Sequence, residues 1–208
     1  MHTSVIVDDH PAIRLAVRSV LESSGLFKVV GEADSGPTAL TVIREAQPSL
    51  VILDLDLPKM NGLELIERLK SSNPAIKLLV LSAQQESIFA SRALQAGANG
   101  FMSKAEGMSS IVQAAQSVLA GYSVFPSSAL GSFTGAGTSP SDLVKTLSDR
   151  ELTVLQQLAR GMSNKEIGDA LLISNKTVSS YKTRVFEKLN ISTLVELVDF
   201  ARANDLIT

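Results

Sequence analysis

Five polar side chains stand where short runs of Val, Ile and Leu end. Asp8 and Asp9 follow the first run, Asp54 the third, Ser82 the fourth, and Lys104 lies just past the fifth. Runs of this kind are typical of parallel strands that are buried on both faces. Open α/β sheets bind their ligands at the carboxyl ends of such strands. We therefore expect these five side chains to meet in one cleft.

A cluster of three carboxylates needs a cation to offset the repulsion between them. The chain has no cysteine and only two histidines, His2 and His10, which excludes thiolate and histidine-rich metal sites. Carboxylate oxygens suit a hard ion, so we expect Mg²⁺ or Mn²⁺. Lys104 and Ser82 are suited to contact phosphoryl oxygens. Asp54 is then the nucleophile that takes the phosphoryl group.

Alternating strands and helices are needed to position these groups. The predicted strands are residues 4–7, 27–30, 50–53, 77–81 and 100–102. Apolar residues recur at helical spacing between these strands and again after the last one. The pattern predicts an α/β domain, a doubly wound five-stranded parallel sheet of the flavodoxin-like type, that ends near Tyr122.

These residues resemble a known family over residues 1–122, the receiver domains of two-component response regulators. Beyond the five polar residues, the family's spacing is matched by Pro58, Gly62, Ala83 and Phe101. The resemblance implies that a sensor histidine kinase supplies the phosphoryl group to Asp54 in the presence of Mg²⁺. It also implies that Ser82 and Lys104 contact that group.

The resemblance further assigns a metal site and a switch residue. The metal ligands that it implies are Asp8, Asp9, Asp54 and the backbone carbonyl of Asp56. Phe101 occupies the position of the family's switch aromatic and is expected to move inward after phosphorylation. That movement is expected to reshape the face made by the fourth helix, the fifth strand and the fifth helix. Receivers would then pair through this face, or the C-terminal domain would be released.

Several other readings of the same residues stay open. Asp9 is also placed to cap the first helix, and His10 is also placed to support the acidic cluster without binding the metal. The whole domain is alternatively a pseudo-receiver in a transcription regulator that binds DNA independently of phosphorylation. A phosphohydrolase is the competing enzyme class, but it needs a second acid or base and a substrate-covering cap, and no insertion supplies one. We therefore expect a protein that is not an enzyme.

Composition changes after the fifth predicted helix. Residues 127–141 are Gly, Ala, Ser, Thr or Pro except for Leu130 and Phe133, and such a segment buries little apolar surface. We expect a flexible linker over residues 123–144. From residue 145 to residue 208 the spacing is helical, and Ser148 with Glu151 has the pattern of a capping box. The prediction is a separate all-α domain of four helices, with the last beginning at Ser192.

The third of these helices is basic. Residues 174–188 carry four basic residues against one acidic residue, Glu187, although the whole chain has a net charge of −2. Its packing face is expected to consist of Val178, Val185 and Leu189. Basic side chains and small hydroxyls around a helix N-terminus suit the DNA major groove and its phosphates.

The helical region resembles the LuxR-type helix-turn-helix domain of the NarL/FixJ class, and more loosely its BvgA/EvgA group. The motif residues are 147–151, 161–167, 173–178 and 188–189. The resemblance implies base-edge contacts from Ser179, Ser180 and Thr183. The other DNA-contacting residues that we expect are Lys165, Asn175, Lys176, Thr177, Lys182, Arg184 and Lys188.

The partners that follow are double-stranded DNA, a sensor histidine kinase, RNA polymerase and a second copy of the chain. A dimer is expected because a small domain gains affinity by binding paired half-sites. The first residues have no basic region, and charged residues interrupt the first apolar run at Asp8. We therefore expect no secretory signal, no membrane partner and a cytoplasmic protein.

Overall fold

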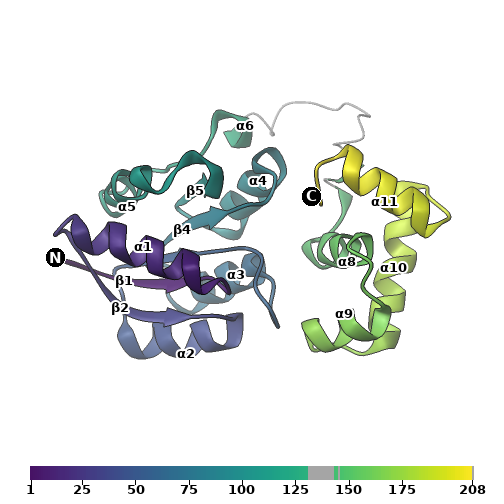
Figure 1. Ribbon diagram of the computed structural model, residues 1–208, viewed down its shortest axis with the longest axis horizontal. Helices are drawn as coiled ribbons and strands as arrows, with labels where there is room; N and C mark the ends of the chain where they lie inside the picture. The colour runs from purple at the N-terminus through teal and green to yellow at the C-terminus, as the bar shows by residue number, and fades with distance from the viewer. Residues whose placement is uncertain (131–142, 145, 208) are drawn as a thin grey trace. The chain divides into compact units, whose positions relative to one another are not determined.

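The computed structural model describes residues 1–130, 143, 144 and 146–207, and the chain divides into two compact units. The first, Met1–Phe133, is called the sheet unit, and the second, Thr134–Thr208, is called the helical unit. Figure 1 shows the sheet unit in purple to teal and the helical unit in green to yellow. No helix among the described residues is long and apolar enough to cross a membrane.

A five-stranded parallel sheet forms the centre of the sheet unit, as predicted. Its strands are β1 (His2–Val7), β2 (Phe27–Ala33), β3 (Leu50–Leu53), β4 (Lys77–Ser82) and β5 (Gly100–Ser103). The order across the sheet is β2-β1-β3-β4-β5, with every neighbouring pair parallel. All four residues of β3 are buried, which explains why that strand is continuously apolar.

Helices cover both faces of this sheet (Figure 1). They are α1 (Pro11–Ser23), α2 (Gly36–Ala46), α3 (Gly62–Ser72), α4 (Glu86–Ala96) and α5 (Ile111–Leu119). The helices α1 and α5 pack together, whereas α2, α3 and α4 contact one another in sequence. On the side that carries α1 and α5, a buried core includes Val17, Leu21, Phe27, Ile52 and Val118.

The first residues of the predicted linker are packed against the sheet unit. Val124 forms a parallel bridge with Gly100, and a short helix, α6 (Ser127–Leu130), packs on α4. Residues 131–142 lie outside the described residues, and the last two residues of the predicted linker, Leu143 and Val144, are helical, with Val144 fully buried. Composition alone did not indicate these contacts, because they use backbone groups and small side chains.

The second strand is longer than the sequence predicted. The prediction ended it at Val30, but β2 continues to Ala33. A register shift between Ser4 and Val5 in β1 lets pairing resume from Gly31 to Ala33. The partly exposed residues near the end of β2 lack the apolar pattern on which the prediction depended.

The described part of the helical unit contains the four predicted helices, preceded by helical residues at 143, 144 and 146. The four helices are α8 (Asp149–Ala159), α9 (Asn164–Leu171), α10 (Asn175–Leu189) and α11 (Leu194–Ala203). Ser148, Ser163 and Ser174 cap the first three through side-chain hydrogen bonds. The fourth begins at Leu194, with Thr193 as its cap, and not at the predicted Ser192. The helix α8 packs on α9, α10 and α11.

Glu151 ties α8 to α10. Its side chain, which is only 4% exposed, accepts a hydrogen bond from the Ser148 amide at 2.8 Å and lies 2.6 Å from Lys188 Nζ. Burial raises the pKa of Glu151, but the bonds from Lys188 and Ser148 outweigh burial, so its net pKa is lowered. The carboxylate is therefore part of the fold at neutral pH.

Replacing Glu151 with Gln should destabilise the helical unit by about 1–3 kcal/mol at neutral pH, because a buried charged acceptor is lost. Folding lowers the pKa of Glu151. The stabilisation is therefore fully present at pH values above the pKa of Glu151 in the unfolded chain, and it is lost as the pH falls through the pKa in the folded protein. Glu151→Gln should therefore be less sensitive to acid than the wild type. Hydrogen exchange of α8 and α10 amides across pH measures both effects.

Glu166 provides a matched control for this substitution. It has the same place in the capping box of α9, where its carboxylate accepts from the Ser163 amide at 2.8 Å, but it is exposed. Glu166→Gln should cost less than Glu151→Gln. Equal losses for the two variants would contradict the importance of the Lys188 contact.

Candidate functional site

The carboxyl ends of the strands bring the predicted polar residues to one edge of the sheet. Asp8 follows β1, Asp54 follows β3, Ser82 ends β4 and Lys104 follows β5. Backbone pairing continues beyond the strands, because the Asp54 amide donates to the Val7 carbonyl at 2.8 Å. The positions of the two acidic side chains are thus set by the sheet itself.

Lys104 bridges two buried carboxylates. Its Nζ lies 2.7 Å from Asp8 Oδ2 and 2.6 Å from Asp54 Oδ2. Both acidic side chains are 3% exposed and the Lys104 side chain is 13% exposed. The other Asp54 oxygen, Oδ1, accepts from the Leu55 amide at 2.7 Å. The Asp54 carboxylate is therefore held by the Lys104 cation and by the backbone amides of Leu55 and Asp56.

Buried Asp54 and partly buried Lys104 differ in how far their partners offset the effect of burial on their pKa values. Burial raises the pKa of Asp54, and the Lys104 ammonium offsets only part of that rise. Burial lowers the pKa of Lys104, but Asp54 and Asp8 outweigh it, so the net pKa of Lys104 is raised. The lysine stays charged, whereas ionised Asp54 is less favourable in the fold than in the unfolded chain.

Asp9 and His10 complete an acidic cluster at the mouth of the site. Ligand atoms of Asp8, Asp9, His10 and Asp54 all lie within 4.8 Å of one another. Asp9 Oδ1 is buried and has no hydrogen-bond donor among the described residues, although His10 Nδ1 lies 2.5 Å from it. Carboxylate oxygens from three residues gathered this closely suit a hard cation. These residues therefore fit a divalent metal ion.

The structure argues against helix capping as the role of Asp9. The N-cap residue of α1 is His10, and its side chain makes no capping hydrogen bond. The His10 amide donates instead to Asp8 Oδ1 at 2.9 Å. His10 thus orients Asp8 through its backbone, which fits the supporting role considered for it.

The loop after Asp54 is shaped by the start of α3. A Cβ on Gly62 would lie 2.5 Å from Leu55 Cα and 2.8 Å from the Asp54 carbonyl oxygen, so a side chain would displace this loop. The Gly62 amide donates to the Leu55 carbonyl at 3.1 Å. Asp56, whose carbonyl was expected to bind metal, lies in this loop and is partly buried.

Ser82 and Phe101 are both buried. Ser82 Oγ accepts from the Gln84 amide at 3.2 Å, and Ser82 is the last residue of β4. Phe101 lies on β5, three residues before Lys104, and is 2% exposed. Phe101 is therefore already part of the core, so the expected inward movement has no exposed starting position in this structure.

Sequence reasoning missed Arg14. Its Nη1 donates to the Asp8 carbonyl at 2.7 Å, and its Nε lies 3.1 Å from Glu32 Oε2. Arg18 Nε binds the other Glu32 oxygen at 2.7 Å. This network connects α1 to the ends of β1 and β2. No motif signals it, because it depends on the distance between two surface segments.

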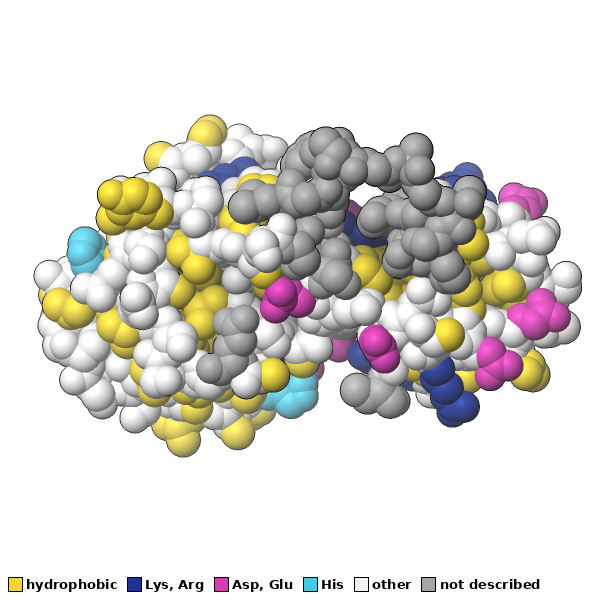
Figure 2. Space-filling view, turned by 90° about the horizontal axis from the view of Figure 1, so that it is seen from above, with side chains coloured by type: hydrophobic (Ala, Val, Ile, Leu, Met, Phe, Trp, Pro, Cys, Tyr) yellow, Lys and Arg dark blue, Asp and Glu magenta, His cyan; other side chains and the backbone are white. Residues whose placement is uncertain are grey.

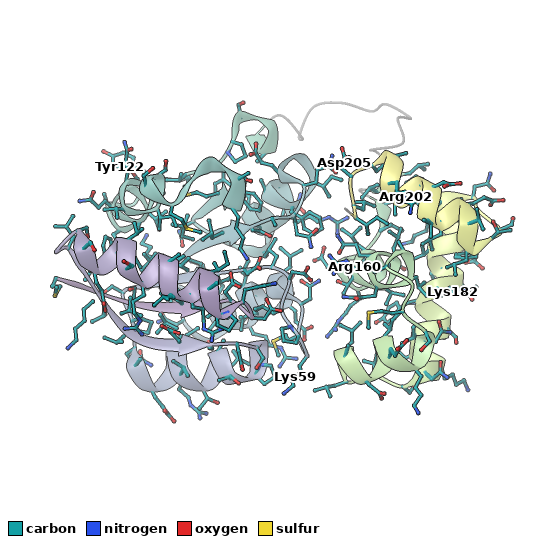
Figure 3. All side chains as sticks on the ribbon, viewed as in Figure 1. Lys59, Tyr122, Arg160, Lys182, Arg202 and Asp205 are labelled. Carbon is teal, nitrogen blue, oxygen red and sulfur yellow. The ribbon has the colours of Figure 1, made fainter. Side chains whose placement is uncertain are left out.

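The exposed side chains of α10 form a candidate nucleic-acid surface. Of the predicted contact residues, those exposed are Lys165, Asn175, Lys176, Ser179, Ser180, Thr183, Arg184 and Lys188, whereas Thr177 and Lys182 are half-buried. Asn164 Nδ2 on α9 donates to Ser179 Oγ at 3.1 Å. Figure 3 labels Lys182, which projects from α10, and its Nζ lies 5.4 Å from the Phe186 ring centroid.

Several of the expected DNA contacts already have partners inside the helical unit, Lys188 and Thr177 among them. Lys188 Nζ binds Glu151 and also donates to the Thr146 carbonyl at 3.0 Å, so this cation is already paired. The Thr177 hydroxyl lies 2.8 Å from the Ser174 hydroxyl. Lys176 and Arg184 remain the exposed cations of α10 with no ion pair among the described residues.

Replacing Asp54 with Asn should stabilise the metal-free protein by an amount that grows with pH. Because folding raises the pKa of Asp54, the folded wild type binds this proton more tightly than the unfolded chain does. The free energy of unfolding of the wild type therefore falls as the pH rises through the pKa of Asp54 in the folded protein. The free energy of unfolding of Asp54→Asn does not fall in this way, because the variant has no carboxyl group to ionise. Urea unfolding with a chelator, from about pH 4 to about pH 7, measures the difference. If the stability difference between the variant and the wild type stays constant or shrinks as the pH rises, the pKa of Asp54 is not raised by folding.

Comparisons with known families match both units. Residues 5–116 match the response regulator receiver domain, and residues 145–201 match the luxR family of bacterial regulatory proteins. Each match covers one of the two sets of candidate residues described above. The two matches agree with the resemblances that the sequence indicated.

Similar proteins align along nearly the whole chain. BvgA of Bordetella pertussis, whose name describes a positive transcription regulator of virulence factors, is 50% identical over 97% of each chain. The DNA-binding transcriptional activator EvgA of Escherichia coli is 35% identical over 98% of each chain. A structure of RcsB from Salmonella enterica serovar Typhimurium, bound to a promoter with phosphomimetic BeF3-, has a TM-score of 0.75 at 26% identity, covering 97% of this chain and 98% of that one. The chain therefore belongs to the response regulators that join a receiver domain to a LuxR-type DNA-binding domain.

Proposed function

We propose that Asp54 accepts a phosphoryl group from a sensor histidine kinase, and that this step controls sequence-specific DNA binding by the helical unit. The observation that carries the proposal is the Lys104 ammonium between the buried carboxylates of Asp8 and Asp54. A cation held at that point can follow negative charge from the carboxylate to a phosphoryl oxygen. An ordinary structural ion pair would not need a second buried acid beside it.

Transfer forms a bond between an Asp54 oxygen and phosphorus while the bond from phosphorus to the donor breaks, and the donor leaves with that electron pair. Lys104 then exchanges Asp54 Oδ2 for a phosphoryl oxygen, and Ser82 donates its hydroxyl to another. The added charge of about −1.5 to −2 makes this rearrangement favourable. Phe101, on the strand that leads to Lys104, moves with it.

Mg²⁺, or Mn²⁺ in its place, is the cofactor that this donor set suits. The residues that would hold it are the side chains of Asp8, Asp9 and Asp54 and the backbone carbonyl of Asp56. When bound, the ion supplies positive charge that offsets the charge of the carboxylates and of the incoming phosphoryl group. The close grouping of the Asp8, Asp9 and Asp54 oxygens supports this assignment.

In the helical unit, α10 is proposed to enter the major groove. Lys165, Lys176, Lys182 and Arg184 would contact phosphates, while Asn175, Thr177, Ser179, Ser180 and Thr183 would lie toward base edges. Ser180 and Thr183 donate to backbone carbonyls one turn earlier, each at 3.1 Å. Their oxygens are therefore oriented as acceptors for base amino groups.

We further propose the domain limits, partners and location of the protein. A receiver domain over about residues 1–122 and a DNA-binding domain over about 145–208 are supported by the two family matches. The proposed active form is a homodimer on paired half-sites that contacts RNA polymerase in the cytoplasm. Exposed apolar residues on α11, Leu194 and Val195, support pairing of the helical units.

The site assignment is tested by mass spectrometry of the protein after incubation with acetyl phosphate and Mg²⁺. Wild type should gain one phosphoryl group, mapped to Asp54, and Asp54→Asn should gain none. Asp56→Asn is the matched control and should still be phosphorylated. A wild-type protein without an adduct, or an adduct retained in Asp54→Asn, would contradict the assignment and favour the pseudo-receiver.

The DNA assignment predicts a change in salt dependence. Lys176→Ala should weaken binding to specific and non-specific duplexes alike, and should reduce the slope of log K against log salt by about 0.9, because one phosphate contact is lost. Fluorescence anisotropy over a salt series measures both quantities. Lys28→Ala removes an exposed lysine of β2 and should change neither. An unchanged slope in Lys176→Ala would rule out a phosphate contact.

A further inference from the structure

The segment that leaves the sheet unit is paired with the edge of β5. The Phe101 amide donates to the Val124 carbonyl at 2.7 Å, and the Val124 amide donates to the Asn99 carbonyl at 3.1 Å. The Val124 side chain also packs on the buried core. We call residues 124–130 the strap. Its first residue is thus hydrogen-bonded directly to the backbone of Phe101.

A glycine at the start of β5 makes this approach possible. A Cβ on Gly100 would lie 3.1 Å from the Val124 carbonyl oxygen and 2.8 Å from Leu79 Cδ1. The position is therefore crowded from the strap on one side and from β4 on the other. A larger residue there would displace Val124 or strain the sheet.

The two hydrogen bonds of Val124 have partners of different rigidity. Asn99 is fixed to the neighbouring elements: its amide donates to the Leu78 carbonyl at 2.8 Å, and its Oδ1 accepts from the Leu78 amide and from Lys70 Nζ, each at 3.0 Å. Phe101 is the residue proposed to move after phosphorylation. Movement of Phe101 while Asn99 stays in place must distort the pairing of Val124.

The far end of the strap contacts a second element next to the site. The Ala129 amide donates to the Pro126 carbonyl at 3.0 Å, and Ala129 is fully buried. Here α6 packs on α4, as Figure 1 shows. Because α4 follows Ser82 and β5 leads to Lys104, the strap contacts both elements that respond to the phosphoryl group.

A cavity of about 330 Å³ lies beside the strap and gives it room to rearrange. Its wall includes Phe101, Val124, Phe125 and Pro126, together with Gln113 and Ser117 of α5. None of its lining residues is charged. In Figure 2, which views the molecule from the α5 and α6 side, uncharged side chains dominate the visible surface of the sheet unit. Side chains can shift into this space without burying a charge.

We propose that the strap is the output element of the receiver: phosphorylation of Asp54 weakens the backbone pairing of Val124 with both Phe101 and Asn99 and so frees the chain that leads to the DNA-binding domain. This inference rests on the proposed function and adds the route by which phosphorylation of Asp54 affects the DNA-binding domain. It also bears on the expectation that two receivers pair through the face made by α4, β5 and α5. The strap already occupies the edge of β5, so that face is not open to a second receiver until the strap leaves.

Amide hydrogen exchange on the full-length protein tests the first step. With Mg²⁺ and the phosphomimetic BeF3-, exchange of the Val124 amide should accelerate by about tenfold or more, the effect of losing one hydrogen bond. The Asn99 amide, which donates to β4, is the internal control and should be unchanged. Unchanged or slower exchange at Val124 in a protein that has bound BeF3- would overturn the proposal.

Two substitutions at one position test the consequence for DNA. Val124→Pro removes the amide that donates to Asn99, whereas Val124→Ala shortens the side chain and keeps both backbone bonds. On a duplex selected in vitro with the wild type, BeF3- should change the affinity of Val124→Ala and of the wild type by similar factors. It should leave the affinity of Val124→Pro unchanged. A full response in Val124→Pro would overturn the proposal.

The two proposals fail in different ways. If wild-type Asp54 takes up neither acetyl phosphate nor BeF3-, the proposed function fails and the strap has no signal to transmit. If Asp54 is loaded and DNA affinity responds, but Val124 exchange stays constant, only the strap proposal fails. The exchange measurement uses the wild type, so it decides the matter even if Val124→Pro does not fold.

Discussion

The sheet edge depends on one cation between two buried acids. Without Lys104, the carboxylates of Asp8 and Asp54 would face one another in a site from which water is largely excluded. The sheet makes this arrangement unavoidable, because parallel strands end at the same edge and the backbone holds Asp54 next to Val7. Burial already makes ionised Asp54 unfavourable. If a phosphoryl group draws Lys104 away from Asp54, the ion pairs that offset the burial of these carboxylates therefore change.

In the helical unit, the helix N-termini are satisfied by nearby side chains, and one buried acid also binds a lysine from another helix. Serine residues cap three of its helices, and Glu151 binds both a cap amide and Lys188. The basic charge that is left for DNA is therefore smaller than the residue count of α10 suggests. Lys176 and Arg184 carry most of it on that helix.

The acidic cluster was predictable from sequence because its geometry follows from strand order alone, and the capping box at Ser148 follows from local spacing. Other features required the fold. Arg14 meets the Asp8 carbonyl only because α1 lies over the end of β1. The composition around Val124 indicated a linker, yet Gly100 allows its backbone to join β5. Lys188 stands at a sequence position that predicted a DNA contact, but it pairs with Glu151, which lies on another helix. Such contacts between distant segments leave no periodic signal.

The central claim is that the state of Asp54 sets the affinity of the helical unit for DNA. The most direct measurement is the dissociation constant for a selected duplex, with and without BeF3- and Mg²⁺, for wild type and for Asp54→Asn. BeF3- should change the affinity of the wild type and leave that of Asp54→Asn unchanged. An affinity that ignores BeF3- in both proteins, or changes equally in both, would contradict it and identify a DNA-binding regulator that does not depend on this site.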